Sequence, residues 1–332
     1  MIVSDGLFDL QVNGFAGIDF NDPAITAERL DVALAAMLRT GVTACLPTLI
    51  TAFEAELRER ILALDAAVAG SRLGPAMVAG YHVEGPFLNA GDGFRGCHPA
   101  EAMGDPDPAL YRSLGEGLGR PILLVTLAPE RPGAIATIRA LREAGIAVAM
   151  AHSDASIHDV REAAAAGLTL STHLGNGLPR TLHKTENPLL GQLAEPGLTA
   201  CFIADGHHLS PDALGAMLRI KGVERSILVT DAVLAAAAPP GHYRFAGMEV
   251  ERDRDGVVRQ PGSAYLAGSA LELDAAVRNV VEWGLATPGQ AIAMASANPR
   301  AALAEAARAQ GIELPTGRVV WSDELRPVEV TP

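Results

Sequence analysis

The stretch Ala151-His152-Ser153-Asp154-Ala155-Ser156, together with Ser171-Thr172-His173-Leu174-Gly175-Asn176, decides the fold of this chain. An apolar run precedes each histidine, at residues 146–150 and 168–170, and the Ala-rich segment between them favours a helix. A strand, a helix and a second strand within about 20 residues make one βα repeat, which sets both imidazoles at the same end of neighbouring parallel strands. Two histidines placed in this way are suited to hold a metal ion.

The same alternation recurs along the chain. Apolar runs predict strands at residues 7–12, 43–47, 77–83, 121–127, 146–150, 168–170, 198–203 and 226–230. Helical spacing follows most of them, for example at residues 26–39, 52–69, 133–144 and 211–221. Eight such alternations predict an α/β fold, a (β/α)8 barrel of the TIM type.

Three segments depart from the alternation. Residues 88–107 form a loop rich in Gly and Pro, and so long a loop inside a barrel is typically functional. Residues 240–265 contain Asp255-Gly256, which indicates a β-hairpin insertion. Two further helices are expected at 273–283 and 288–307, the second with a kink or break at Asn298-Pro299. We therefore expect one barrel domain over residues 1–310 with that insertion, and a C-terminal tail over residues 311–332.

Composition excludes several classes of partner. The chain has 332 residues, of which 49% are hydrophobic, enough for a single large core. Its net charge of −13 argues against nucleic acid and anionic membranes as partners. The sequence has no signal-peptide pattern at its start and no apolar run near the roughly 18 residues of a membrane span. Its three cysteines are widely spaced without a CxxC pair, which predicts reduced thiols and a cytoplasmic location.

Polar residues gather at the C-terminal ends of the expected strands, which is where barrel enzymes carry their active sites. One carboxylate and two neutral imidazoles leave coordination positions open, as in a catalytic metal site, and such a metal lowers the pKa of bound water to about 7. A further carboxylate, Asp231, would accept a proton from that water and return it to a leaving amine. These rim residues are Gln11, Asn13, Glu84, His152, His173, His208 and Asp231.

Each of these residues also has a purely structural interpretation. His152 and His173 could be hydrogen-bonded core histidines, Glu84 a turn residue, and Asp231 a helix N-cap. Their joint position on one rim favours a common site.

The motifs along the chain resemble the amidohydrolase superfamily and, within it, the N-acetylglucosamine-6-phosphate deacetylase family. The matching pieces occur in the family's order from the first strand to beyond the eighth. They are Asp9-Leu10-Gln11-Val12-Asn13-Gly14, His82-Val83-Glu84-Gly85-Pro86-Phe87, Ala151-His152-Ser153-Asp154-Ala155, Thr172-His173-Leu174-Gly175-Asn176, Ala204-Asp205-Gly206-His207-His208, Val229-Thr230-Asp231-Ala232 and Leu266-Ala267-Gly268-Ser269.

The resemblance implies roles for individual residues. Glu84, His152 and His173 match the positions that bind a divalent metal, and Asp231 matches the catalytic acid/base. His208 matches a contact near the scissile amide, and His98, Asn176 and Gly177 match substrate contacts. Gln11 and Asn13, on the same rim, are also expected to contact the substrate. Gln11-Val12-Asn13 stands where many amidohydrolases have His-x-His, so we expect one metal ion. Zn²⁺ is the expected ion, with Fe²⁺, Mn²⁺ and Co²⁺ as alternatives. The resemblance also implies homodimers with shared sites.

The chain differs from the family at two places that bear on function. The turn after the sixth strand reads Gly175-Asn176-Gly177-Leu178, and the arginine that follows it in the family is absent. Its role as the substrate-binding cation would fall to Arg180, His183 or Lys184. We expect the small β-sandwich that normally accompanies the barrel to be missing or vestigial. The expected reaction is hydrolysis of N-acetylglucosamine 6-phosphate to glucosamine 6-phosphate and acetate. The alternatives are an amidohydrolase for another N-acyl or cyclic amide, phosphorylated or unphosphorylated, and a non-catalytic sugar-phosphate binding protein, against which Asp231 argues.

Overall fold

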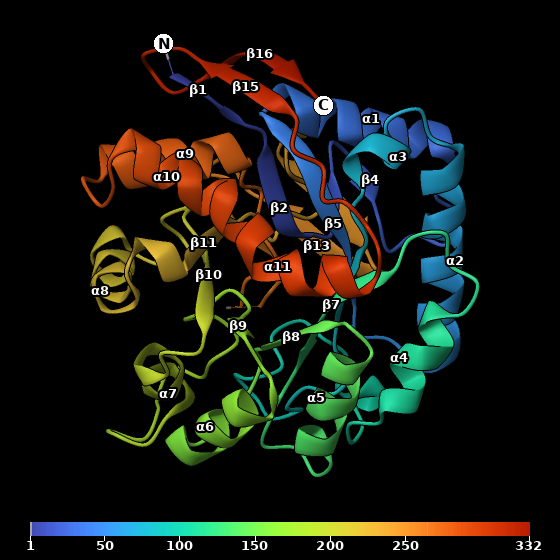
Figure 1. The fold of residues 1–332 in the computed structure, drawn as a ribbon, viewed down its shortest axis with the longest axis vertical. Helices are drawn as coiled ribbons and strands as arrows, with labels where there is room; N and C mark the ends of the chain where they lie inside the picture. The colour runs from blue at the N-terminus through green and yellow to red at the C-terminus, as the bar shows by residue number, and fades with distance from the viewer. Residues whose placement is uncertain (1, 264) are drawn as a thin grey trace.

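The fold is a parallel β-barrel surrounded by helices (Figure 1). The computed structural model describes residues 2–263 and 265–332. Within these residues, one sheet has eight parallel strands in the order β11-β10-β9-β8-β7-β6-β5-β2. This arrangement confirms the expected (β/α)8 barrel of the TIM type. The strands are β2 (Leu7–Val12), β5 (Val42–Ile50), β6 (Tyr81–Glu84), β7 (Ile122–Leu127), β8 (Ala147–Met150), β9 (Leu170–Ser171), β10 (Thr199–Ile203) and β11 (Ser226–Val229).

Helices cover the outside of the barrel, and local sequence signals set their ends. In α6, the Ser156 side chain and Asp159 form a capping box, and Gly167 ends the helix with a φ of 116°. The helices are α1 (Ala27–Arg39), α2 (Glu54–Gly70), α3 (Gly74–Met77), α4 (Pro108–Gly115), α5 (Ala134–Glu143), α6 (Ile157–Ala166), α7 (Pro188–Ala194), α8 (Pro211–Lys221), α9 (Leu273–Glu282), α10 (Pro288–Ala295) and α11 (Ala297–Ala309), with 3₁₀ turns η1 (Ala100–Ala102) and η2 (Val223–Arg225). In the described part of the chain, no helix combines the length and apolar character that crossing a bilayer requires.

The first and last strands of the barrel sheet are joined by hydrogen bonds that close the barrel. The backbone N–H of Asp231, just after β11, donates to the carbonyl of Gln11 in β2 over 2.9 Å. The N–H of Asn13 donates to the carbonyl of Ala232 over 2.7 Å. Every residue of β2 is buried, as expected for a parallel strand that is covered on both faces.

The expected C-terminal helix is divided in two. α10 ends before Ser296, whose φ is −132°, and α11 begins after it. The break precedes Asn298-Pro299 because Pro299 lies in the first turn of α11, where its missing N–H is not needed. α11 lies against the N-terminal ends of β8 and β9, where a Cβ atom on Gly145 would lie 2.6 Å from the Cβ of Ala309. The opposite end of the barrel carries the site.

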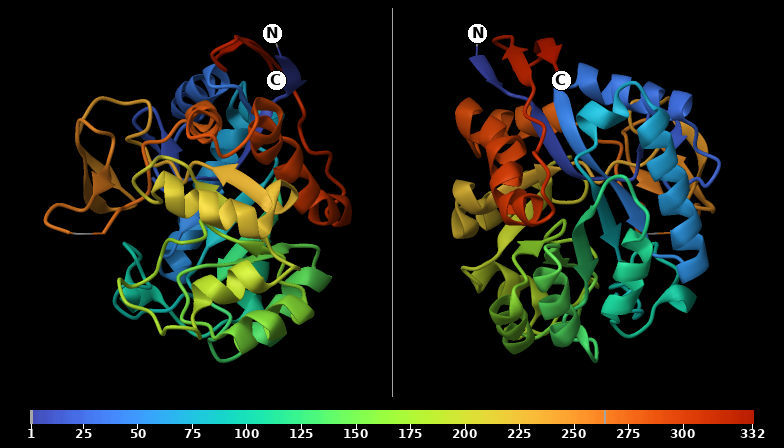
Figure 2. Two further views of the ribbon diagram at one scale, coloured as in Figure 1. Left: turned by 90° about the vertical axis from the view of Figure 1, so that its left-hand side faces the viewer. Right: turned by 45° about the vertical axis from the view of Figure 1, so that its right-hand side comes forward.

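An antiparallel sheet lies within residues 241–259 and projects from the side of the barrel (Figure 2). It consists of β12 (Gly241–Phe245), β13 (Met248–Arg252) and β14 (Val258–Arg259). The sequence signal at Asp255-Gly256 lies between β13 and β14, whereas the longer β12–β13 pairing was not predicted. Val233, Phe245 and Val250 belong to a small core of this sheet, separate from the main core.

The two chain ends meet in a second small sheet, in the order β1-β15-β16. It consists of β1 (Ile2–Asp5), β15 (Arg318–Trp321) and β16 (Pro327–Thr331), so residues 311–332 contribute two strands. The Trp321 side chain is buried, and its indole N–H donates to the Ser4 hydroxyl over 2.9 Å. The sequence predicted that the family's small β-sandwich would be missing or vestigial. At the chain ends, the structure has this three-stranded sheet. A short ribbon, β3 (Gly14–Phe15) and β4 (Ile18–Asp19), follows β2.

Candidate active site

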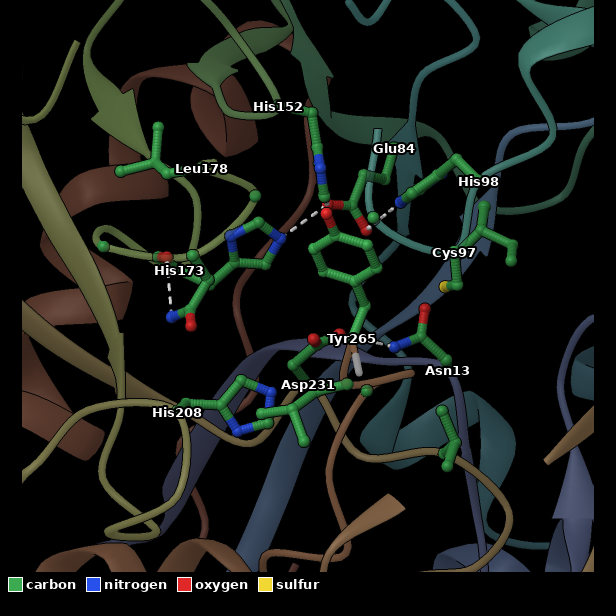
Figure 3. A pocket seen from close by; sticks show the side chains of 18 of the residues that line it. Asn13, Glu84, Cys97, His98, His152, His173, Leu178, His208, Asp231 and Tyr265 are labelled. Carbon is green, nitrogen blue, oxygen red and sulfur yellow. Dashed lines mark hydrogen bonds and ion pairs between the residues drawn. The ribbon is translucent and has the colours of Figure 1, made fainter. Parts of the chain in front are cut away.

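A cavity opens at the C-terminal ends of the barrel strands (Figure 3). Loop 88–107 contributes Gly93, Gly96 and Cys97 to its wall, and the segment after β14 contributes Tyr265. Most of the side chains that the sequence predicted for the site line this cavity. They are Asn13, Glu84, His98, His152, His173, Asn176, Gly177, His208 and Asp231.

Three imidazoles surround the buried carboxylate of Glu84. The Nε2 atoms of His173 and His152 lie 2.9 and 3.4 Å from its Oε1 atom. The Nε2 atom of His98 lies 4.0 Å from its Oε2 atom. Burial alone would raise the pKa of Glu84, but the imidazoles of His152 and His173 outweigh it and hold that pKa well below its usual range. Glu84 is therefore ionised and faces three nitrogen atoms.

The hydrogen bonds behind two of these imidazoles set which ring nitrogen carries the proton in the neutral form. The Nδ1 atom of His152 lies 2.6 Å from the carbonyl of Phe94, which only accepts, so Nδ1 carries the proton. The Thr51 hydroxyl donates to the backbone carbonyl of Glu84, so it accepts from Nδ1 of His98 over 2.9 Å. A ring that also carries a proton on Nε2 donates toward Glu84 and stabilises its charge, whereas in the neutral rings both Nε2 atoms present lone pairs toward the ionised carboxylate.

This arrangement fits a bound cation. The Nε2 atom of His152 is buried and has no hydrogen-bond partner among the described residues. Lone pairs of His152 and His98 that face a carboxylate repel it unless a positive charge lies between them. The candidate ligand atoms of Glu84, His98 and His152 lie within 4.8 Å of one another, and one carboxylate with imidazoles is a donor set for Zn²⁺ and similar ions. The cluster includes His98, which the sequence had placed among the substrate contacts.

Three site residues hold strained backbone conformations. The φ angles of His152, His173 and Asp231 are 50°, 30° and 49°, in the left-handed region that residues with a Cβ atom rarely adopt. Each of the three lies two residues beyond the last residue of a barrel strand, β8, β9 and β11 respectively. Such strain persists where the surrounding structure imposes it, and it is typical of functional sites.

The turn after β9 packs directly against His152. A Cβ atom on Gly177, whose φ is 63°, would lie 2.5 Å from the His152 Nδ1 atom, and one on Gly96 would lie 3.1 Å from its Cε1 atom. The side chain of Asn176 donates to the carbonyl of His173 over 3.0 Å and stabilises the same turn. Glycine is therefore required at position 177 because the imidazole occupies the space of a side chain.

Asp231 lies across the cavity from Glu84. The side-chain amide of Asn13 donates to its Oδ1 atom over 2.7 Å. Burial raises the pKa of Asp231 to about 6. A carboxyl group that titrates near neutral pH is suited to accept and return a proton.

His208 is oriented by Asp205, a residue that sequence reasoning did not single out. The Asp205 carboxylate accepts from Nδ1 of His208 over 2.6 Å and from the backbone N–H groups of His207 and His208 over 2.8 Å. Burial alone would raise the pKa of Asp205, but these bonds lower it. Nε2 of His208 is therefore the ring nitrogen that remains for a ligand. The sequence Asp-Gly-His-His could have indicated this contact, because an Asp side chain often accepts hydrogen bonds from the backbone two and three residues later in a turn.

Two predicted substrate contacts lie outside the cavity wall. Lys184 is exposed on the segment after Leu178, and Gln11 lies beneath the cavity, where its amide donates to Glu84 over 3.0 Å. Among the described residues, no Lys or Arg side chain lines the cavity.

Comparisons with known proteins agree on one family, although no protein-family model matches the sequence. The N-acetylgalactosamine-6-phosphate deacetylase of Escherichia coli O157:H7 is 36% identical, over 88% of this chain and 75% of that protein. The N-acetylglucosamine-6-phosphate deacetylase of Lysinibacillus sphaericus is 31% identical, over 88% of this chain and 74% of that protein. The crystal structure of N-acetyl-D-glucosamine-6-phosphate deacetylase from Mycobacterium smegmatis superposes with a TM-score of 0.86 at 29% identity, covering 99% of this chain and 85% of that one. A mutant of that enzyme was solved in complex with N-acetyl-D-glucosamine-6-phosphate, with the same TM-score of 0.86. The motifs, the barrel and these relatives together establish that this chain belongs to the N-acetylglucosamine-6-phosphate deacetylase family of the amidohydrolase superfamily.

Proposed function

We propose that this chain hydrolyses the N-acetyl amide of N-acetylglucosamine 6-phosphate and releases glucosamine 6-phosphate and acetate. The observation that carries the proposal is that His152 and His173 both lie against Glu84 in one cavity that Asp231 also lines. The group of ligand atoms within 4.8 Å of one another has His98 in place of His173. The relatives named for this reaction support the choice of substrate. Because other relatives are named for the galactosamine epimer, that sugar is the natural second substrate to assay.

In this proposal Glu84, His152 and His173 hold one divalent ion, with Zn²⁺ the expected ion. Such an ion activates a water molecule and polarises the carbonyl of the amide. The tautomers of His152 and His98 suit this role because their Nδ1 atoms are occupied by Phe94 and Thr51. His98 would serve as a further ligand of the ion or as a substrate contact, since its Nε2 atom lies 4.0 Å from Oε2 of Glu84.

The side chains across the cavity handle the proton and the substrate. Asp231 accepts a proton from the attacking water and delivers it to the nitrogen of the leaving amine, so that the amine departs neutral. His208 offers Nε2 to the substrate because Asp205 holds its Nδ1. Asn176 and Gly177 line the side of the cavity formed by the turn after β9.

Metal removal and one conservative variant test this function together. Acetate release from N-acetylglucosamine 6-phosphate should stop after treatment with a chelator and return with Zn²⁺ or another divalent ion. Asp231→Asn should lower kcat by roughly 100- to 10,000-fold, because general acid–base catalysis contributes about that factor. The metal content of the variant, measured by atomic absorption, serves as the control and should equal that of the parent. Chelator-resistant hydrolysis, or an active Asp231→Asn enzyme, would contradict the proposal.

A second candidate is an amidohydrolase for an unphosphorylated N-acyl substrate. It is favoured by the cavity wall, which has no Lys or Arg side chain within the described residues, although a phosphate group normally meets such cations. The ratio of kcat/KM for N-acetylglucosamine 6-phosphate to that for N-acetylglucosamine separates the two candidates. A ratio near one would favour the second. The expected homodimer and cytoplasmic location stay predictions from the sequence.

A further inference from the structure

Gln11 in strand β2 and Asn13, which directly follows that strand, direct buried amides at the two carboxylates of the site. Nε2 of Gln11 donates to Oε2 of Glu84 over 3.0 Å, and Nδ2 of Asn13 donates to Oδ1 of Asp231 over 2.7 Å. Both amides are 2% exposed. Because residues two apart on a strand point to the same face, one strand serves both acids.

The carboxylates impose these orientations. An ionised carboxylate only accepts hydrogen bonds, so each amide must present its NH₂ group to it. The other ends of the amides, Oε1 of Gln11 and Oδ1 of Asn13, are buried and have no hydrogen-bond partner among the described residues. Leaving a buried carbonyl oxygen unpaired is unfavourable. The orientation of the two amides is therefore set by the hydrogen bonds that their NH₂ groups donate to the carboxylates, and not by any bond to their carbonyl oxygens.

The backbone of β2 also fixes the position of Asp231. The carbonyl of Gln11 accepts from the N–H of Asp231, and the N–H of Asn13 donates to the carbonyl of Ala232. Asn13 therefore holds this segment through both its main chain and its side chain. Asp231 needs such support because its φ of 49° is strained.

We propose that Gln11 and Asn13 are positioning residues, the first acting through Glu84 and the second through Asp231. The proposal rests on the proposed function of these two acids. Gln11 occupies Oε2 of Glu84, so Oε1 remains directed at His152 and His173. Asn13 occupies Oδ1 of Asp231, so the proton is exchanged at Oδ2. Strand β2 thus contributes hydrogen-bond donors to the site.

The two residues predict different defects, which makes each the control for the other. Asn13→Leu removes the donor to Asp231 at similar size. The effect should depend on the leaving group, because a departing amine needs the proton from Asp231 whereas 4-nitrophenolate departs without one. We expect kcat for N-acetylglucosamine 6-phosphate to fall roughly 100-fold. In the same variant, kcat for 4-nitrophenyl acetate should fall less than about 10-fold. The affinity for Zn²⁺ should not change.

Gln11→Met removes the donor to Glu84 at similar size. The dissociation constant for Zn²⁺, measured by competition with a chromophoric chelator, should rise about 10- to 100-fold, as for other residues that orient metal ligands. Excess Zn²⁺ should restore the turnover of both substrates in parallel. This binding measurement needs no substrate.

Three results would overturn the proposal. They are an equal loss of both activities in Asn13→Leu, an unchanged Zn²⁺ affinity in Gln11→Met, and full amide hydrolysis by Asn13→Leu. Asn13→Ala, which has no donor and adds no charge beside Asp231, provides a second variant if the leucine protein does not fold, as judged by circular dichroism. It should show the same dependence on the leaving group. If the parent protein does not hydrolyse the sugar amide, the proposed function fails, while the Zn²⁺ titration of Gln11→Met still tests the role of Gln11.

Discussion

At the scale of single residues, Asp9 is a buried acid beneath the site. Its carboxylate accepts from the Thr230 hydroxyl over 2.5 Å and from the backbone N–H groups of Thr230 and Gln11 over 3.2 and 3.3 Å. Burial outweighs these bonds and raises the pKa of Asp9 to about 7. Asp9 thus joins β2 to the end of β11 in its protonated form at mildly acidic pH.

This pKa predicts a pH dependence of stability. Because the folded-state pKa of Asp9 lies above its value in the unfolded chain, the folded protein binds the proton more tightly, and stability falls as the pH rises through that interval. Between about pH 5 and pH 8, the free energy of unfolding of the parent should fall about 2 kcal/mol more than that of Asp9→Asn. Urea denaturation at both pH values measures the difference. Parallel pH profiles would show that Asp9 is ionised in the folded protein.

Several of the residues that the sequence predicted for the site lie at or just beyond a strand end: Glu84 ends β6, and His152 and Asp231 lie two residues beyond β8 and β11. Glu84, His152 and Asp231 come together because the ends of parallel strands meet at one rim. The partners that orient them could not be predicted in this way. The carbonyl of Phe94 and the hydroxyl of Thr51 belong to loops, and a backbone carbonyl has no sequence signature.

At the scale of elements, the turn after β9 and loop 88–107 enclose the His152 imidazole from two sides. Gly177 comes from the turn, and Gly96 from the loop. The carbonyl of Phe94, in the same loop, accepts the Nδ1 proton of His152. The loop was expected to be functional from its length alone, and it is this contact that ties it to the candidate metal site.

A methyl group at Gly177 should therefore weaken metal binding. It would lie 2.5 Å from Nδ1 of His152 and displace the ring from the Phe94 carbonyl. We expect Gly177→Ala to raise the dissociation constant for Zn²⁺ about 10- to 100-fold. Gly117→Ala is the matched control, because Gly117 also has a positive φ, of 79°, but has open space around its Cβ position. Unchanged Zn²⁺ affinity in Gly177→Ala would show that the contact with His152 does not matter for metal binding. An equal loss in Gly117→Ala would show that backbone strain, and not this contact, weakens binding.

The elements were predictable where their apolar pattern was long. The strand predicted at 121–127 is β7 (Ile122–Leu127), and the helix predicted at 211–221 is α8. α4 and α7 were not predicted, because each spans only about two turns and its signals are a cap and a proline. The pairing of β12 with β13 was missed as well, since exposed charged residues alternate along both strands and the main core does not include them.

At the scale of the whole molecule, the chain ends stabilise each other. β1 pairs with β15, and the indole of Trp321 fills the space beneath this sheet, where it is fully buried. The Arg300 guanidinium joins this region to the barrel by donating to the carbonyls of Gly6, Pro315 and Thr316. The terminal sheet therefore belongs to the folded unit of the barrel.

Loss of the indole should destabilise the entire protein. Trp321→Ala should lower the free energy of unfolding by about 3–5 kcal/mol, the range for removing a large buried aromatic side chain. Val328→Ala, in the same sheet but 60% exposed, should change it by less than about 0.5 kcal/mol. Urea denaturation monitored by circular dichroism measures both changes. A separate early transition in Trp321→Ala, with the barrel transition unchanged, would show that the sheet unfolds independently.

The left-handed φ angles of His152, His173 and Asp231 bear on attempts to engineer this protein. Glycine at any of these positions would relieve an unfavourable conformation, so selection for heat tolerance alone would tend to discard the groups that perform the chemistry. Thermal stability and catalytic activity therefore place opposite demands on these three positions. A library meant to improve the first has to leave them unchanged.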